Sequence, residues 1–196
     1  MKSLMFALTL FVAMPRPAAA AAAPAESPEH VALRQLKDEL STAANKMDMD
    51  GILKHLHPNV IVTWQNAEVS RGRDGVREYL ERKTGGANPI VKGFHTSVEI
   101  DELTALYGNT GIAYGSSLDH FDLVGGQSFD LHGRWTFVLV KDQGQWLVAA
   151  MHASTNLFDN PLLNAAKRAA VLGSAAAFVT ALLLGLFVGK KFLGGR

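Results

Sequence analysis

The sequence predicts an α+β domain, in which a curved, mostly antiparallel sheet of about six strands wraps around N-terminal helices, followed by one transmembrane helix. Helical periodicity comes early, over residues 31–44. Long runs of β-branched and aromatic residues follow between residues 91 and 156, and residues 169–189 contain neither charge nor proline. Helices followed by a meander of strands are typical of an α+β arrangement. Strong curvature of the sheet would make a cone with one open end.

Residues 1–25 have the pattern of a secretory signal peptide. Lys2 precedes the apolar run 4–14, and small residues follow it in an alanine-rich block. A short positive start, an apolar core and small residues are the features of such a signal. The apolar run is too short to span a bilayer comfortably. An uncleaved anchor and a disordered leader are the alternatives.

The helical region begins the domain, which we place at residues 28–158. Apolar residues at helical spacing predict one amphipathic helix over 31–44, and Ile52, Leu53 and Leu56 predict a second short helix that ends at His57-Pro58. The sequence around Asp48 and Asp50 lacks the other ligand residues of a calcium loop, so we interpret these two as capping and turn residues. We expect His55 and His57 at the surface.

Strands follow the helices, interrupted by one more helix. Residues 60–64 and 68–72 predict two short strands around a turn at Gln65-Asn66, and residues 73–83 predict a third helix. The four long strands are expected at about 91–103, 110–123, 128–141 and 145–156. The last two form a hairpin in which Trp135, Phe137 and Leu139 share a face. The opposite face is also apolar, so we expect both to be covered, one by helices and one by another subunit or more sheet.

Residues 161–196 are expected to be a transmembrane helix with a short basic tail. The apolar stretch 169–189 matches the roughly 30 Å hydrocarbon core of a bilayer. Asn160-Pro161 is typical of a helix start. With an export signal upstream, the domain would face the periplasm or exterior and the C-terminus the cytoplasm. Small residues spaced by four favour self-association of this helix; they are Gly173, Ala177, Ala181, Gly185 and Gly189.

Composition excludes some functions. The net charge of +1 and the lack of a basic motif give no indication of nucleic acid as a partner. The chain has no cysteine, which excludes disulfides, thiolate metal sites and a cysteine nucleophile. We expect no cofactor.

Four segments carry a resemblance to known proteins. They are Asn45-Lys-Met-Asp-Met-Asp-Gly-Ile-Leu, His57-Pro-Asn-Val-Ile-Val-Thr-Trp, Ser70-Arg-Gly-Arg-Asp-Gly-Val-Arg-Glu-Tyr-Leu and Gln143-Gly-Gln-Trp-Leu-Val-Ala-Ala-Met-His-Ala-Ser. Together they resemble the nuclear transport factor 2-like superfamily, and within it the SnoaL-like domains. The resemblance implies a conical pocket between sheet and helices and homodimers through the outer sheet face. Members include ketosteroid isomerases, polyketide cyclases and dehydratases, and many only bind or dimerise. The positions of the catalytic residues of the ketosteroid isomerases correspond here to Leu40, to Trp64 and approximately to Arg134 or Trp135. None of these residues matches the residue types that the isomerases use.

Polar residues of the last strands are the candidates for chemistry. Side chains alternate between the two faces of a strand. This alternation predicts one face of the last strand with Trp146, Val148, Ala150, His152 and Ser154, and one face of its neighbour with His132, Arg134 and Thr136. If these faces coincide, then His152 and Arg134, with His132 or Asp119, converge in the cone. There His152 beside a carboxylate would be a general acid or base and Arg134 would hold an oxyanion. A structural ion pair of Arg134 is the alternative. The further polar candidates are His95, Glu99, Tyr114 and His120.

These observations lead to an expected function with two alternatives. We expect an exported, membrane-anchored homodimer whose cone binds a small, partly apolar molecule or a partner segment, with Trp64, Tyr114, His132 and Trp135 as ligand-binding residues. A tethered isomerase, cyclase or hydratase, with His152, Arg134 and Asp119 as catalytic residues, is the first alternative. A dimerisation module of a membrane complex is the second. His120, His132 and His152 have no fixed ligand spacing, so no metal site is expected.

Overall fold

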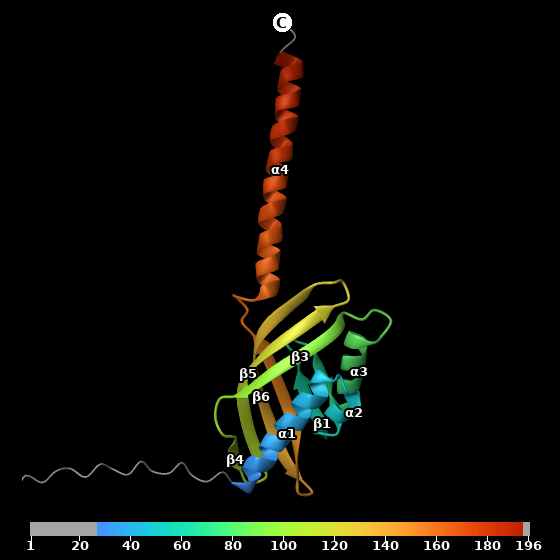
Figure 1. Ribbon diagram of the computed structural model, residues 1–196, viewed down its shortest axis with the longest axis vertical. Helices are drawn as coiled ribbons and strands as arrows, with labels where there is room; N and C mark the ends of the chain where they lie inside the picture. The colour runs from blue at the N-terminus through green and yellow to red at the C-terminus, as the bar shows by residue number, and fades with distance from the viewer. Residues whose placement is uncertain (1–26, 194–196) are drawn as a thin grey trace, which may run out of the picture.

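Helices, strands and one long terminal helix make up residues 27–193, the part of the chain that the computed structural model describes. The expected signal peptide, residues 1–25, lies outside these residues. Along the chain, the elements are α1 (Pro28–Asn45), α2 (Met49–Leu53), β1 (Leu56–Thr63), β2 (Val69–Arg71), α3 (Gly72–Thr84), β3 (Val91–Ile100), β4 (Ala105–Tyr107), β5 (Thr110–Leu123), β6 (Ser128–Asp142), β7 (Gln145–Thr155) and α4 (Pro161–Leu193). The predicted α+β class is confirmed (Figure 1).

Local capping explains where the first helices begin. The Ser27 side chain accepts a hydrogen bond from the His30 backbone N–H at 3.3 Å, and Pro28 occupies the first helical position. The Asp48 side chain accepts one from Gly51 at 3.0 Å and caps α2. The capping role expected for Asp48 is thus confirmed.

The strands form one curved, unclosed sheet in the order β2-β1-β7-β6-β5-β3, and β4 pairs with β5 beside this path. Every pairing is antiparallel except that of β1 with β7, which is parallel. The seventh strand is β4, a three-residue element that the sequence analysis did not identify. In Figure 1 the helices α1, α2 and α3 lie on one side of this sheet, which we call its inner face.

The first strand begins earlier than predicted. Leu56 opens β1, although its spacing from Ile52 and Leu53 suggested that it continues the second helix. The parallel pairing with β7 is irregular between Leu56 and Ile61. Pro58 lies in this interval, and a proline has no N–H for a regular ladder. The tertiary pairing to β7 therefore outweighs the helical pattern of the sequence.

His55 is also placed differently from the prediction. The residue was expected at the surface, but only 4% of it is exposed. Its Nε2 lies 3.3 Å from the Glu39 carboxylate on α1, an ion-pair distance without hydrogen-bond geometry. Its backbone carbonyl accepts a hydrogen bond from Val148, so His55 is fixed between α1 and β7.

A bulge in β7 decides which residues face inward. Val138 pairs with Ala150 and the next residue, Leu139, pairs with Val148, so Ala149 is the extra residue. Trp146 and Val148 therefore belong to the inner face, whereas Ala150 and His152 belong to the outer one. The prediction that Trp146 and Val148 share one face of the strand with Ala150 and His152 is therefore wrong, because the bulge interrupts the alternation of side chains.

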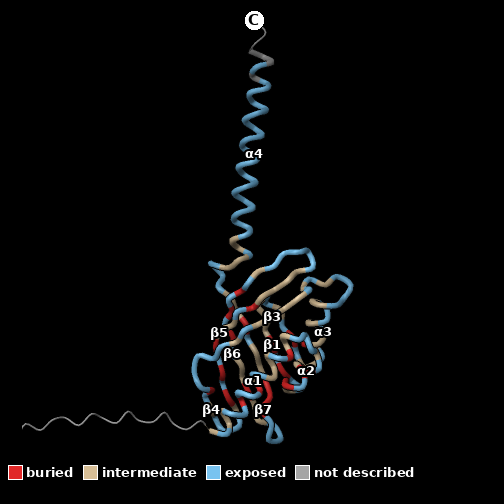
Figure 2. The backbone as a smooth tube through the Cα atoms, in the orientation of Figure 1, coloured by how far each residue is buried: buried red, intermediate tan, exposed pale blue. Residues whose placement is uncertain are grey.

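The core lies between the inner face and the helices, as the buried segments in Figure 2 show. Trp135 and Leu139 of β6 pack there, as predicted for that face of the hairpin. On the opposite face Thr136 is exposed and Val138 and Val140 are half-buried. That another subunit or more sheet covers them stays a prediction.

The helix α4 stands apart from the domain (Figure 1). Its segment Pro161–Val188 is long and apolar enough to cross a membrane, with a mean hydropathy of 2.3 in its most apolar window and none of that window buried. This helix is therefore not part of the core of the domain. Asn160 accepts a hydrogen bond from the Leu163 N–H at 2.9 Å, which confirms the predicted N-cap.

Candidate functional site

The sheet separates the predicted catalytic residues. Arg134 pairs across the strands with Ser154 and Ser116, and Thr136 pairs with His152. These residues share the outer face, and His132, Arg134 and His152 are exposed there. Asp119 pairs with Leu131 on the inner face and is 5% exposed. His152 and Arg134 do share a face, but the expected convergence with Asp119 inside the cone does not occur.

Arg134 has the structural partner that we gave as its alternative role. Its guanidinium donates to both carboxylate oxygens of Asp101 and lowers the pKa of Asp101. The same pairing raises the pKa of Arg134. A bidentate pair of this kind balances the charge of the guanidinium and uses two of its five N–H donors.

The four expected ligand-binding residues are spread over both faces. Trp64 is half-buried, stacks on Tyr79 with 4.1 Å between ring centroids and donates to the Ser70 hydroxyl at 2.9 Å. Trp135 is buried in the core and donates to the Ser116 carbonyl at 3.0 Å. Tyr114 and His132 lie on the outer face. Hydrogen bonding to Glu102 raises the pKa of Tyr114.

Asp119 is the centre of a polar cluster on the inner face, which we call the Asp119 cluster. Its Oδ2 accepts hydrogen bonds from Gln65 Nε2 at 2.8 Å and Ser117 Oγ at 3.0 Å, and its Oδ1 accepts one from Thr96 Oγ1 at 2.7 Å. All three donors are neutral. Asn45, the last residue of α1, holds Thr96 through two hydrogen bonds to its backbone.

The Asp119 carboxylate is buried without an opposite charge beside it, which costs stability. A buried charge is normally paired with an opposite charge, yet within residues 27–193 no ion pair includes Asp119. A carboxylate has about four acceptor positions, and the three donors fill three of them. Oδ2 thus accepts two hydrogen bonds and Oδ1 accepts one from the described residues.

Three phenylalanines form a row next to this cluster, which we call the aromatic row. Phe94, Phe121 and Phe129 are direct cross-strand neighbours on β3, β5 and β6, and all three are half-buried. Ring centroids are 5.1 Å apart for Phe94 and Phe121 and 5.4 Å for Phe121 and Phe129. Phe121 follows Asp119 by two residues, so both side chains lie on the inner face.

The sequence contained part of the signal for this site. Ser117, Asp119 and Phe121 alternate along one strand, and that spacing alone places them on one face. Gln65 precedes Asp119 by 54 residues and was interpreted only as a turn residue. Its role depends on the sheet bringing the end of β1 to the middle of β5.

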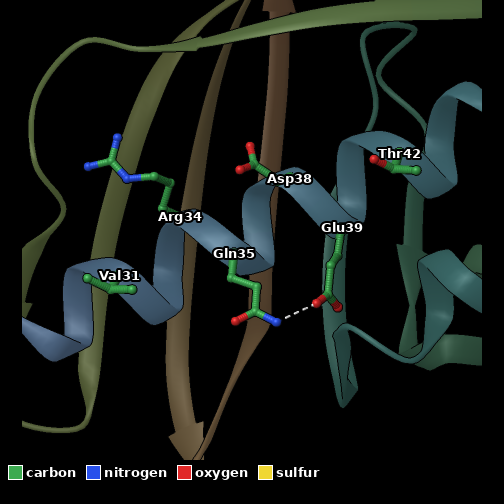
Figure 3. Close-up of a pocket in the computed structure, with 6 residues that line it drawn as sticks. All are labelled: Val31, Arg34, Gln35, Asp38, Glu39 and Thr42. Carbon is green, nitrogen blue, oxygen red and sulfur yellow. Dashed lines mark hydrogen bonds between the residues drawn. The ribbon is translucent and has the colours of Figure 1, made fainter.

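Two surface hollows lie elsewhere. The first, about 430 Å³, follows one stripe of α1 (Figure 3) and is lined by Val31, Arg34, Gln35, Asp38, Glu39 and Thr42. The second, about 300 Å³, lies at β2 and α3 and is lined by Glu68, Val69, Ser70, Arg71, Gly75, Glu78, Tyr79 and Arg82. Neither contains Asp119, His152 or Arg134.

Tyr79 and Glu68 at the second hollow have shifted acidities. Burial raises the pKa of Tyr79 to about 12. Hydrogen bonds from Arg82 and Lys83 lower the pKa of Glu68 to about 2. Within residues 27–193 no group of three or more histidine and acidic side chains is arranged to hold a metal ion.

Comparison with known proteins places the fold in a family. Solved structures that resemble the chain include a ketosteroid isomerase-like protein from Erwinia carotovora atroseptica (17% identity, TM-score 0.60, covering 66% of this chain and 98% of that one). Another is the hexachlorocyclohexane dehydrochlorinase LinA-type3 from Novosphingobium barchaimii (15% identity, TM-score 0.56, covering 67% of this chain and 89% of that one). A third is a protein from Xanthomonas campestris assigned as a calcium/calmodulin dependent protein kinase II association domain (20% identity, TM-score 0.54, covering 70% of this chain and 94% of that one).

At these identities the likeness concerns the fold alone. No curated protein matches the chain. The sequence model of the SnoaL-like domain, however, matches residues 25–152, which is well over half of the 196 residues. The chain therefore belongs to the SnoaL-like domain family.

Proposed function

We propose that this protein is a membrane-anchored binding protein whose SnoaL-like domain holds a small, partly apolar molecule between the Asp119 cluster and the aromatic row. The observation that carries the proposal is the buried carboxylate of Asp119, which accepts hydrogen bonds from three neutral donors and forms no ion pair within the described residues. The aromatic row supplies apolar contact next to it. The ligand would therefore carry a cationic or neutral donor group on an aromatic or aliphatic body.

Binding is favoured over catalysis because Asp119 has no partner for acid–base chemistry in the described residues. Its hydrogen-bond donors are an amide and two hydroxyls. His152 and Arg134 lie on the opposite face, so they cannot share a bound molecule with it.

The proposed location is a single-pass membrane protein, with the domain on the periplasmic or extracellular side and the C-terminus in the cytoplasm. The apolar segment Pro161–Val188 supports the anchor. Residues 1–25 support export because their composition is typical of a signal peptide.

The ligand proposal is tested with three probes that share one skeleton. The full chain in phosphatidylcholine nanodiscs is titrated with 2-phenylethylamine, 2-phenylethanol and phenylacetate, and binding is followed by ligand-observed NMR. The amine should bind best and the anion worst, because a buried carboxylate attracts a donor and repels a like charge. Asp119→Asn should remove the preference for the amine, whereas Asp130→Asn on the exposed outer face should keep it. Equal binding of phenylacetate, or equal loss in both variants, would contradict the proposal.

A second function, dimerisation, is supported by the outer face. Ile61, Ile112, Tyr114 and Leu118 are large, exposed side chains on β1 and β5, and neighbouring apolar side chains of this kind are typical of protein interfaces. We therefore propose a homodimer through this face. Leu118→Glu should shift the detergent-solubilised chain toward monomer in analytical ultracentrifugation. Val31→Glu, at another exposed apolar position, on α1, should not. A dimer that Leu118→Glu leaves intact would argue against this interface.

A further inference from the structure

Exposed apolar side chains gather at the end of the domain from which α4 departs. Ile90 and Val124 lie together, since the Val124 N–H donates to the Ile90 carbonyl at 3.0 Å. Leu157 and Phe158 lie in the connection between β7 and α4 and are 74% and 81% exposed. We call these four residues the membrane-side rim. Figure 1 shows the β5–β6 hairpin, which ends near Val124, reaching the level at which α4 begins.

The connection that sets this geometry is held by hydrogen bonds. Asn156 Oδ1 accepts from the backbone N–H groups of Phe158 and Asp159, at 3.0 and 3.2 Å. Asn160 Nδ2 donates to the Asn156 carbonyl at 2.9 Å. Asn164 Nδ2 donates to Asp159 at 3.2 Å. These bonds order the short connection between the last strand and the first turn of α4.

The length of α4 indicates where its first residue lies in a membrane. At 1.5 Å per residue its 33 residues span about 50 Å. A bilayer with its headgroups is about 40–45 Å thick. A helix that crosses it therefore begins, at Pro161, close to the outer boundary of the headgroups. The membrane-side rim is at that same level.

We infer that the membrane-side rim lies in the interfacial layer of the bilayer that α4 crosses, so that the domain rests on the lipid surface. The composition of the hairpin tip fits this environment, because residues 123–128 contain no charged side chain. Burial of apolar side chains in the interface is favourable, and the membrane anchor α4 lowers the entropic cost of reaching it. The occupant of this apolar surface is thus lipid.

The contact has a consequence for the proposed ligand site. Along β5 the inner face runs from Asp119 through Phe121 to Leu123, and Val124 follows at the tip. Two steps of two residues cover about 13 Å. The aromatic row therefore lies between the Asp119 cluster and the rim. An amphiphilic molecule with its donor group at Asp119 would extend over the row toward the bilayer, which makes a membrane-dissolved ligand the fitting class. This consequence rests on the proposed ligand site, whereas the lipid contact rests only on the proposed membrane anchor.

The test uses the absence of cysteine from the chain. Val124→Cys, Phe158→Cys and Tyr107→Cys each provide one site for an environment-sensitive fluorophore in the full chain, reconstituted in phosphatidylcholine vesicles with or without spin-labelled lipid. Tyr107 is the control, because it is 66% exposed and pairs with Thr110 at the opposite end of β5. The fluorophore at 124 and 158 should be quenched and blue-shifted. At 107 it should show neither change.

Position 124 decides the outcome. Residue 158 adjoins α4 and is near lipid in any arrangement, whereas residue 124 reaches lipid only if the domain rests on the bilayer. Quenching at 158 without quenching at 124 would overturn the inference. Adding Asp119→Asn to Val124→Cys should leave the quenching unchanged, which separates a failure of this contact from a failure of the ligand proposal.

Discussion

The two faces of the sheet carry their polar groups in opposite ways. On the outer face, charges lie in the open and in pairs, as Arg134 does with Asp101 and His120 with Asp130. On the inner face, the carboxylate of Asp119 is buried and is held by neutral donors. Exposed pairs contribute little to stability because water screens them. A buried charge without a counter-ion costs stability, and such a cost is typical of functional positions.

This contrast also shows what residue type alone could not predict. Arg134 and His152 lie on a face that is exposed to solvent. Of the polar candidates, Asp119 is the one that the described residues place on the inner face. That Arg134 and His152 are catalytic stays a prediction. The difference teaches that the environment of a polar group, and not its chemical type, distinguishes a candidate site from a surface ion pair.

The largest effect should come from the apolar part of the inner face. Trp135→Ala removes a side chain that is 7% exposed and packs against the core. We expect a loss of about 3–5 kcal/mol in the free energy of unfolding, because a large cavity remains. Urea denaturation followed by circular dichroism measures it. A loss no larger than that of the adjacent outer-face variant Thr136→Ala would contradict the assignment of the two faces.

Asp119 should give an intermediate effect that depends on the replacement. Asp119→Leu leaves the donors of Gln65, Thr96 and Ser117 without an acceptor, so we expect a loss of about 1–3 kcal/mol. Asp119→Asn keeps an acceptor and removes the buried charge, so its stability should equal or exceed that of the wild type. Thermal unfolding of both variants checks the order. Strong destabilisation by Asp119→Asn would mean that the charge itself holds the fold together.

Arg134→Ala should have a smaller effect on stability. The Arg134–Asp101 pair is exposed, and salt screens such pairs. We expect the midpoint of denaturation to change little at low ionic strength and not at all in 1 M salt. A large, salt-independent loss would show that the outer face carries a structural charge network that matters for folding.

The smallest effect on stability should come from the titration of two histidines, His120 and His55, whose pKa values are shifted in opposite directions. Hydrogen bonding to Asp130 raises the pKa of His120, so its stabilising contribution is complete below its unfolded pKa and is lost as the pH rises through the folded value. Burial lowers the pKa of His55, so the unfolded chain takes up the proton first and stability is lost as the pH falls below the unfolded value. NMR titration should place the two values on opposite sides of about 6.5, the ordinary value for histidine. Asp130→Asn should lower only that of His120.

The order and type of the elements could be predicted from the sequence because their causes are local. Periodicity gave α1, α3 and the long strands to within about one turn at most boundaries. The caps at Asp48 and Asn160 were readable because each lies directly before the helix that it starts. The uniform apolarity of α4 predicted a helix that stands outside the core.

Only the tertiary structure decided which side chains meet. The extra residue Ala149 shifts the parity of β7, and a bulge of one residue leaves no clear mark in an apolar run. The parallel pairing of β1 with β7 buried His55 and drew Leu56 into a strand. The Asp119 cluster joins residues 54 and 23 positions apart. Such contacts depend on how the sheet curves over the helices, because hydrogen bonds between strands and burial against α1 act over distances in the chain that no local pattern encodes.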